Sequence, residues 1–162
     1  MRFALVLVGL LLAAPPPPPA RCACLENIPP PGGWTPDTWQ RAYRAEVERA
    51  VRDSTVVFYG RVLEHSVTTS TFRVDRVWKG PHVPTLQVSN GTVDLGDGRF
   101  VTSGCSRSFR PLGRYIVFAS ADDGLLSSST CGPTHETVAD RPIFKLLDRI
   151  VQPGGLPARA RR

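Results

Sequence analysis

Four cysteines are the residues of this chain best placed to do chemistry. Cys22 and Cys24 stand one residue apart near the amino end, and Cys105 and Cys131 lie far downstream. In an oxidising compartment four cysteines predict two disulfides, for which sequence alone allows three pairings. A Cys22–Cys24 link would close a strained ring, because a single residue separates the two. We therefore expect each of them to reach to one of the distant cysteines, which leaves two cross-pairings open.

Other arrangements that could do chemistry are weak. The histidines show no metal-ligand spacing, and we expect all of them at the surface, at strand or loop ends: His65, His82 and His135. Ser103 and Ser106 flank Cys105 without the glycine-serine-glycine context of a nucleophile elbow. The carboxylates show no pairing logic either. We expect no enzyme activity and no cofactor.

The amino end has the pattern of a secretion signal. Arg2 precedes an apolar run over residues 3–12, which suits a signal-peptide core but is too short for a bilayer span of about 20 residues. The prolines at 15–19 move the expected cleavage to just before or just after Arg21, a residue that also argues against a lipid-anchored Cys22. We predict a signal peptide over residues 1–20 and a secreted protein, extracellular or periplasmic, without a membrane span.

The basic balance of the chain comes from arginine. The formal net charge is +6, and Lys79 and Lys145 are the only lysines. The arginines are scattered, apart from a tail that holds Arg159, Arg161 and Arg162. Export makes nucleic acid an improbable partner for such a chain. The arginines are therefore interpreted mainly as a solvated surface, with contact to anionic envelope or matrix polymers as the other interpretation.

A helix is predicted over residues 37–52. Thr35 can cap it, and Pro36 suits the first helical position. One apolar stripe follows at helical spacing, and we expect it to pack in the core: Trp39, Tyr43, Val47, Ala50 and Val51. A second helix is predicted at 140–151, with the stripe Ile143, Leu146, Leu147 and Ile150, and a disordered basic tail at 152–162.

Between the helices the hydrophobic period changes to two. Strands are predicted at 55–63, 68–78, 83–88, 113–119 and 125–130, with a hairpin turn at 122–124. Residues 90–104, rich in glycine and polar groups, predict a mobile loop. The tripeptide that starts with Asn90 fits either a glycosylation site or a turn. Five strands with short connections favour an antiparallel barrel or sandwich.

Several stretches together resemble a known family. They are the Cys-Ala-Cys at 22–24, Val-Val-Phe-Tyr-Gly-Arg-Val at 56–62, Phe-Arg-Val-Asp-Arg-Val-Trp-Lys-Gly at 72–80, Gly-Arg-Tyr-Ile-Val-Phe-Ala at 113–119 and Ser-Thr-Cys at 129–131, with Cys105 and Phe109 between. Their order resembles the netrin-like module of the tissue inhibitors of metalloproteinases, especially its short bacterial members. The resemblance covers residues 22–131, most of the mature chain.

The resemblance implies a fold and a pairing of the cysteines. It implies an OB-fold barrel over residues 21–135. Together with the predicted strands and helices, this gives a mainly β domain, a five-stranded antiparallel OB-fold-like barrel with flanking helices at about 37–52 and 140–151. The last of these helices would pack on the domain within residues 136–151. The implied disulfides are Cys22–Cys105 and Cys24–Cys131.

The resemblance also implies a function. In the animal inhibitors, the free amine and carbonyl of the first cysteine chelate the zinc of a metalloprotease. Carried over, Cys22 would hold the target's zinc if it is the mature amino terminus. Ala23 would point into the specificity pocket, and the protease-contact ridge would comprise Cys22, Ala23, Cys24 and Leu25. The turn near residues 122–124 would join this edge.

Three hypotheses follow. The first is a secreted, monomeric domain that acts by binding an extracellular or envelope protein, of which a zinc metalloprotease is the most concrete example. The second is a structural or adhesive envelope module, in which arginines bind anionic polymer through salt-sensitive contacts and no inhibition occurs. The third, oligonucleotide binding on the barrel face, is suggested by the fold but disfavoured by export.

Overall fold

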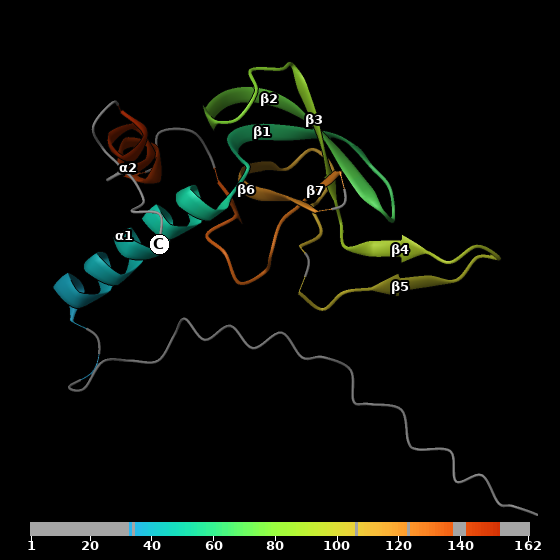
Figure 1. Ribbon diagram of the computed structural model, residues 1–162, viewed down its shortest axis with the longest axis horizontal. Coiled ribbons are helices and arrows are strands. Elements are labelled where there is room, and N and C mark those ends of the chain that lie inside the picture. Colours follow the sequence, from blue (N-terminus) through green and yellow to red (C-terminus); the bar gives the residue numbers. More distant parts are fainter. Residues whose placement is uncertain (1–32, 34, 106, 123, 138–141, 153–162) are drawn as a thin grey trace, which may run out of the picture.

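The computed structural model describes residue 33 and residues 35–105, 107–122, 124–137 and 142–152. They form α1 (Pro36–Asp53), β1 (Val56–His65), β2 (Thr69–Lys79), β3 (Thr85–Ser89), β4 (Thr92–Asp94), β5 (Phe100–Thr102), β6 (Arg114–Asp122), β7 (Leu125–Ser127), β8 (His135–Glu136) and α2 (Pro142–Val151) (Figure 1). The predicted signal peptide, the ridge at Cys22–Leu25 and the predicted basic tail, apart from its first residue Gln152, lie outside these residues.

Five strands close into a barrel. The order is β1-β2-β3-β7-β6, and β6 pairs again with β1 to complete the ring, while β8 adds to β6. The predicted mainly β, OB-fold-like barrel with two flanking helices is confirmed. The prediction that its strands are purely antiparallel is wrong, because β3 and β7 run parallel, with Val88 opposite Leu126. A closed ring with an odd number of strands cannot alternate direction throughout, so at least one pair must be parallel.

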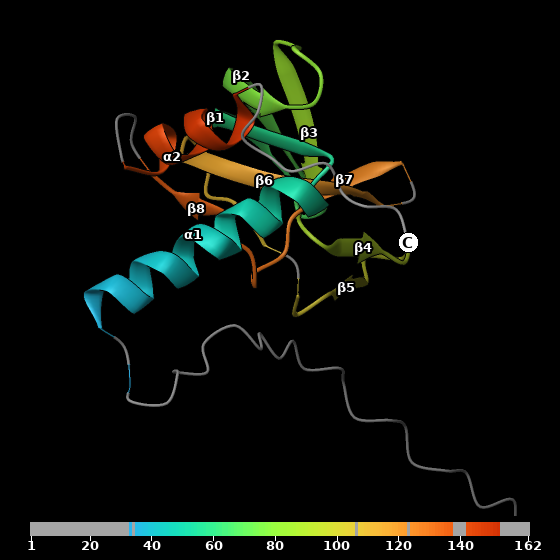
Figure 2. The ribbon, with the colours of Figure 1, turned by 60° about the vertical axis from the view of Figure 1, so that its left-hand side comes forward.

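The barrel wall separates two hydrophobic clusters. Because successive side chains of a strand point to opposite faces, the same strands supply both clusters. The interior contains Val56, Phe58, Val62, Phe72, Val88, Phe109, Tyr115, Val117 and Ala119. The outer cluster joins the wall to both helices through Val47, Val51, Val57, Tyr59, Trp78, Ile116, Phe118, Ile143, Phe144, Leu147 and Ile150. Figure 1 shows both helices at one end of the molecule and the β4–β5 hairpin at the other, and Figure 2 shows the amino end of α1 extending beyond the strands.

Helix α1 begins where the sequence predicts. The Thr35 hydroxyl accepts from Thr38 N–H, the Thr38 hydroxyl accepts in return from Thr35 N–H, and Pro36 takes the first turn. At the other end Lys79 Nζ donates to the carbonyls of Val51 and Arg52, at 2.7 and 2.9 Å. A cation on the last carbonyls satisfies acceptors that the helix leaves open. The sheet therefore caps the helix that covers it.

The apolar stripe of α1 is buried only in part. Val47 and Val51 are fully buried, and Tyr43 and Ala50 pack at the edge of the outer cluster. Trp39 is 54% exposed, so the prediction that it packs in the core is wrong. The first turns of α1 extend past the sheet, and there the aromatic side chain finds no wall to cover.

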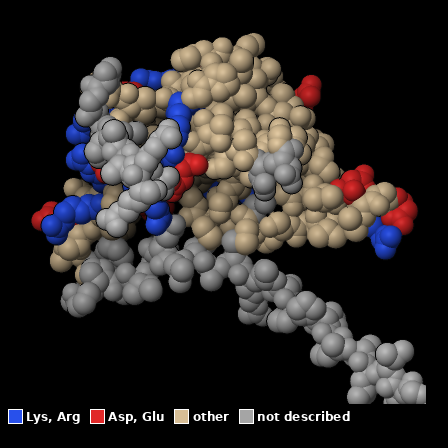
Figure 3. Space-filling view, in the orientation of Figure 1, with Lys and Arg blue, Asp and Glu red and all other residues tan. Residues whose placement is uncertain are grey.

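Residues 90–104 are more ordered than predicted. They contain the hairpin β4–β5, in which Val93 lies opposite Val101. The hairpin projects from the barrel (Figure 1), and Figure 3 shows charged side chains at its tip, where Asp94, Asp97 and Arg99 lie. Each strand has three residues, which is too short for a hydrophobic period to be recognised in sequence. Neither helix in the described part of the chain is long and apolar enough to cross a membrane.

Candidate functional site

The two described cysteines lie on loops that touch. Thr130 N–H donates to the Cys105 carbonyl at 2.9 Å, and Arg107 N–H donates to the Ser128 carbonyl at 2.9 Å. These bonds place Cys105 beside Thr130 and Arg107 beside Ser128. We call this pair of loops the cysteine platform. Neither Cys105 nor Cys131 is a free thiol. The pairing predicted for them involves Cys22 and Cys24, which lie outside the described residues, and it stays a prediction.

Both cysteines are oriented by the same local device. The Ser103 hydroxyl accepts from Cys105 N–H at 3.2 Å, and the Ser129 hydroxyl accepts from Cys131 N–H at 3.0 Å. A serine that accepts from the backbone two residues later closes a small turn. Ser103, which lacks the sequence context of a nucleophile elbow, thus has a structural role. The same small turn therefore precedes each of the two cysteines.

The hairpin β4–β5 leads directly into the platform. Thr102 is the last residue of β5, and Ser103 N–H donates to the Gly91 carbonyl at 2.8 Å, which closes the base of the hairpin. Its large apolar side chains are all about half exposed or more: Val93, Leu95, Phe100 and Val101. Val93 lies directly opposite Val101, so these two exposed side chains share one face of the hairpin, and Phe100 lies on the other face. Exposed apolar side chains that share a face are candidates for contact with another protein.

Asn90 is a structural residue. It is only 2% exposed, its Oδ1 accepts from Ser70 Oγ at 2.8 Å, and its Nδ2 donates to the Ser66 carbonyl at 2.8 Å. A glycan needs an exposed amide nitrogen, so the folded chain cannot carry one at Asn90. The turn interpretation of this tripeptide is the one that fits.

The histidines do not gather into a metal site. His65 Nδ1 contacts Ser70 Oγ at 3.0 Å at the end of β1, and His135 Nδ1 donates to the Pro133 carbonyl at 2.7 Å. His82 is exposed in the connection between β2 and β3. Among the described residues, no group of three or more histidine, cysteine or carboxylate side chains could hold a metal ion.

A groove of about 670 Å³ lies between the first turns of α1, the first turns of α2 and β8. Trp39 and Tyr43 stack in parallel on its α1 side, with ring centroids 5.3 Å apart, and Ile143 and Leu146 line the α2 side. Burial raises the pKa of the Tyr43 hydroxyl, and the Glu46 carboxylate raises it further. Tyr43 therefore contributes to the groove as a neutral phenol. No other side chain of the described residues fills this groove.

Three arginines form a row across the outer wall of the barrel. Arg61 of β1 lies directly opposite Arg73 of β2 on one side and Arg114 of β6 on the other. Side chains of directly opposite residues point to the same face of a sheet. Arg61 follows Tyr59 by two residues and Arg114 precedes Ile116 by two, so the row continues the face that the helices cover. We call these three residues the arginine row.

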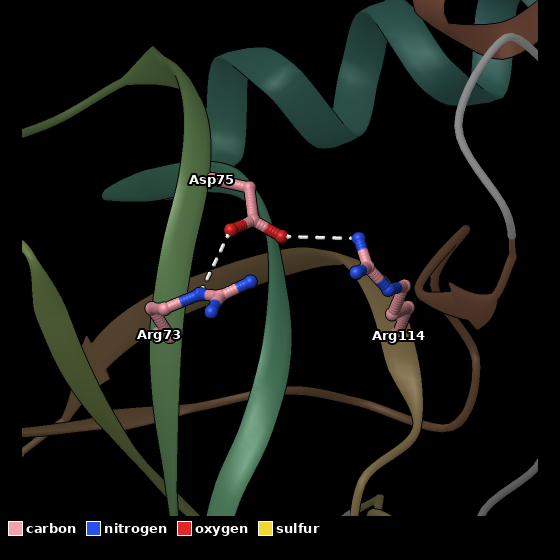
Figure 4. A network of polar contacts seen from close by, with 3 residues as sticks. All are labelled: Arg73, Asp75 and Arg114. Carbon is pink, nitrogen blue, oxygen red and sulfur yellow. Dashed lines mark hydrogen bonds and ion pairs between the residues drawn. The ribbon is translucent and has the colours of Figure 1, made fainter.

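One carboxylate serves this row (Figure 4). Asp75 of β2 accepts from Arg73 Nε at 3.1 Å and from Arg114 Nη1 at 3.3 Å. The side chains of Arg73 and Arg114 are 50% and 43% exposed. No ion pair joins Arg61 to any other residue in the described part of the chain. Asp148 of α2 pairs with Arg76 of β2 at 2.6 Å.

The sequence did not predict the arginine row. Its members are spread over more than fifty positions of a chain whose arginines look scattered. Only the register of β1 against both neighbours brings them together. No protein-family model and no curated protein sequence matches the chain.

Proposed function

We propose that the protein is a secreted, non-enzymatic, netrin-like domain that acts by binding another protein through its amino-terminal segment. The observation that carries this proposal is the contact between the loops of Cys105 and Cys131. Cys22 and Cys24 can be at most about 7 Å apart along the backbone. Two disulfides from such close residues need two partner cysteines that lie side by side, and the cysteine platform meets that requirement.

The tether would hold residues 22–25 as a rigid ridge. Because both ends of Cys22–Ala23–Cys24 would be bonded to the platform, the segment would lose little freedom on binding, which favours affinity. The exposed apolar hairpin next to the platform would extend the contact area. The most concrete partner is a zinc metalloprotease. Catalytic zinc keeps an open coordination position, which the amine and carbonyl of an amino-terminal Cys22 could fill.

The test begins with the mature amino terminus. Intact mass of the secreted protein shows whether cleavage leaves Cys22 first, and peptide mapping shows which cysteines are paired. The protein is then titrated against a panel of zinc proteases, with an N-acetylated sample as the matched control. We expect inhibition by the free-amine form and a loss of inhibition after acetylation.

Three results would contradict this function in whole or in part. A Cys22–Cys24 or Cys105–Cys131 link would remove the rigid ridge altogether. Equal inhibition by the free and acetylated forms would rule out zinc chelation by Cys22. A mature form that starts at Arg21 would block the chelate as well, and would leave protein binding by the ridge without the zinc contact.

A further inference from the structure

We propose that the arginine row is a binding site for a linear acidic polysaccharide, one that carries several carboxylate or sulfate groups. The register places Arg73, Arg61 and Arg114 on three adjacent strands. Opposite residues of antiparallel strands are about 5 Å apart, so the row extends over about 10 Å. This site uses none of the platform cysteines and does not depend on the proposed contact with a protease.

The arginine row places like charges next to one another in the folded chain. Like charges directly opposite each other on a sheet oppose folding. Asp75 pairs with Arg73 and Arg114 but not with Arg61, so the three arginines and this one carboxylate have a net charge of +2. Arg61 stands in the middle, between two other cations and without an ion-pair partner among the described residues. An anionic ligand would neutralise charge that the fold leaves uncompensated.

The shape of the row selects a polymer over a single ion. A guanidinium group presents a planar fork that fits one carboxylate, sulfate or phosphate group. A small anion can meet one or two such forks, whereas a chain with repeated anionic groups can meet all three. Arg73 and Arg114 are about half exposed and Arg61 is partly buried, so the separate contacts are weak and need to be multiplied to give useful affinity.

Two other polymers fit the surface less well. Single-stranded nucleic acid binds through aromatic side chains that stack on the bases. The exposed aromatic side chains among the described residues are Trp39 on α1 and Phe100 on β5, and neither belongs to a strand of the row. A peptide could add as a strand only at an open edge. At the row each strand is paired on both sides: Arg73 with β1 and β3, Arg61 with β2 and β6, and Arg114 with β1 and, through Thr137 N–H, with the end of β8.

The experiment measures binding of the full secreted chain to dextran sulfate and to polygalacturonate by isothermal titration, over a series of salt concentrations. Uncharged dextran, oligo-dT of matched charge and free sodium sulfate are the comparison ligands. We expect both acidic polysaccharides to bind at low salt and the affinity to fall steeply as salt rises, because bound counterions are released. Acetylating the amino terminus should leave this binding unchanged.

Arg61→Gln is the decisive variant. Losing the central cation should weaken binding about three- to fivefold and reduce the slope of log affinity against log salt by about one. Arg99→Gln is the matched control, because it removes the same charge from an exposed arginine of the hairpin, where Arg99 pairs with Asp97 at 2.9 Å. Arg99→Gln should bind like the wild type.

Asp75→Asn tests the row by a gain of binding. It frees Arg73 and Arg114 and raises the net charge of the group from +2 to +3. We expect about threefold tighter binding and a slope steeper by about one. This variant keeps the proposal falsifiable even if Arg61→Gln folds poorly, which circular dichroism would show.

Several results would overturn the proposal. Equal weakening by Arg61→Gln and Arg99→Gln would show that only the overall charge matters. If oligo-dT binds as tightly as dextran sulfate, the ligand is a nucleic acid and the polysaccharide proposal is wrong. Free sulfate that competes as well as the polymer at equal charge would reduce the site to one for a single ion. Loss of binding on deletion of residues 159–162, with no effect of Arg61→Gln, would assign binding to the tail.

Discussion

The outer wall of the barrel has two halves that differ in what covers them. In one half, Tyr59 and Ile116 belong to the cluster that packs against α1 and α2. In the other half, two residues further along the same strands, Arg61 and Arg114 are not part of that cluster. The pairing of β1 with β6 continues unchanged from one half to the other, whereas the pairing of β1 with β2 shifts register between Tyr59 and Gly60.

This difference separates what stabilises the wall from what it offers to a ligand. The covered half contributes apolar burial, the main favourable term in folding. The exposed half repeats one charge on three strands, which costs stability and is tolerated because the rest of the wall is well packed. Such a cost is easiest to understand where a surface binds something.

The largest effect is expected from the covered half. Leu147→Ala removes a fully buried side chain of α2 from the outer cluster and should lower the free energy of unfolding by about 2–5 kcal/mol. Urea unfolding measures this loss. Leu63→Ala, at a half-exposed position of β1, is the control and should change the value little. Equal losses at both positions would show that the helix does not protect this half.

A smaller loss is expected at the boundary between the halves. Gly60 stands between Tyr59 and Arg61, and a Cβ there would lie 2.5 Å from the Arg73 carbonyl oxygen. Because backbone must shift to make room, Gly60→Ala should lower the free energy of unfolding by about 1–3 kcal/mol. Gly104→Ala, where a Cβ meets nothing within 4 Å, is the control. A Gly60→Ala protein as stable as the wild type would contradict the close approach of β1 and β2.

Asp148 connects α2 to the wall and should have a similar or smaller effect. Its Oδ1 accepts from Arg76 Nη2 at 2.6 Å and from Trp78 Nε1 at 2.8 Å. Asp148→Ala leaves the nearly buried indole N–H without an acceptor, and we expect a loss of about 1–2 kcal/mol. Asp148→Asn keeps an oxygen in place and should lose less. If the two variants lose the same amount in thermal unfolding, the bond to Trp78 contributes nothing.

The smallest change in stability is expected in the exposed half. Arg61→Gln removes the repulsion between residue 61 and the arginines on either side of it. The free energy of unfolding should therefore rise, by less than about 0.5 kcal/mol. Added salt should raise the melting temperature of the wild type more than that of this variant, because salt screens the repulsion. A clear destabilisation would mean that Arg61 supports the fold, and the comparison of the two halves would fail.

The parts of the fold that could be predicted depend on local patterns. The cap at Thr35, the burial of Val47 and Val51, and the long strands β1 and β2 all follow from residue type and period. The three-residue strands of the hairpin and the two residues of β8 are too short to show a period. The sequence also could not reveal the parallel pair β3–β7, which follows from closing a ring of five strands.

The candidate sites also divide into parts that the sequence could predict and parts that only the tertiary structure reveals. The cysteines are visible in sequence because their residue type is rare and their spacing is unusual. That Cys105 and Cys131 are neighbours is a tertiary fact, given by bonds between two loops. The arginine row is invisible in sequence because Arg61 meets Arg114 only across the seam that closes the barrel.

The way Asn90 is held also has a consequence for chemical ageing. An asparagine followed by glycine loses ammonia when the glycine nitrogen attacks the side-chain amide and forms a cyclic imide. Here Gly91 N–H donates to Ser89 Oγ at 3.0 Å, and the Asn90 amide is bound to Ser66 and Ser70. Both reacting groups are fixed in place, so this dipeptide should resist deamidation during long storage of the native protein and become vulnerable once the chain unfolds.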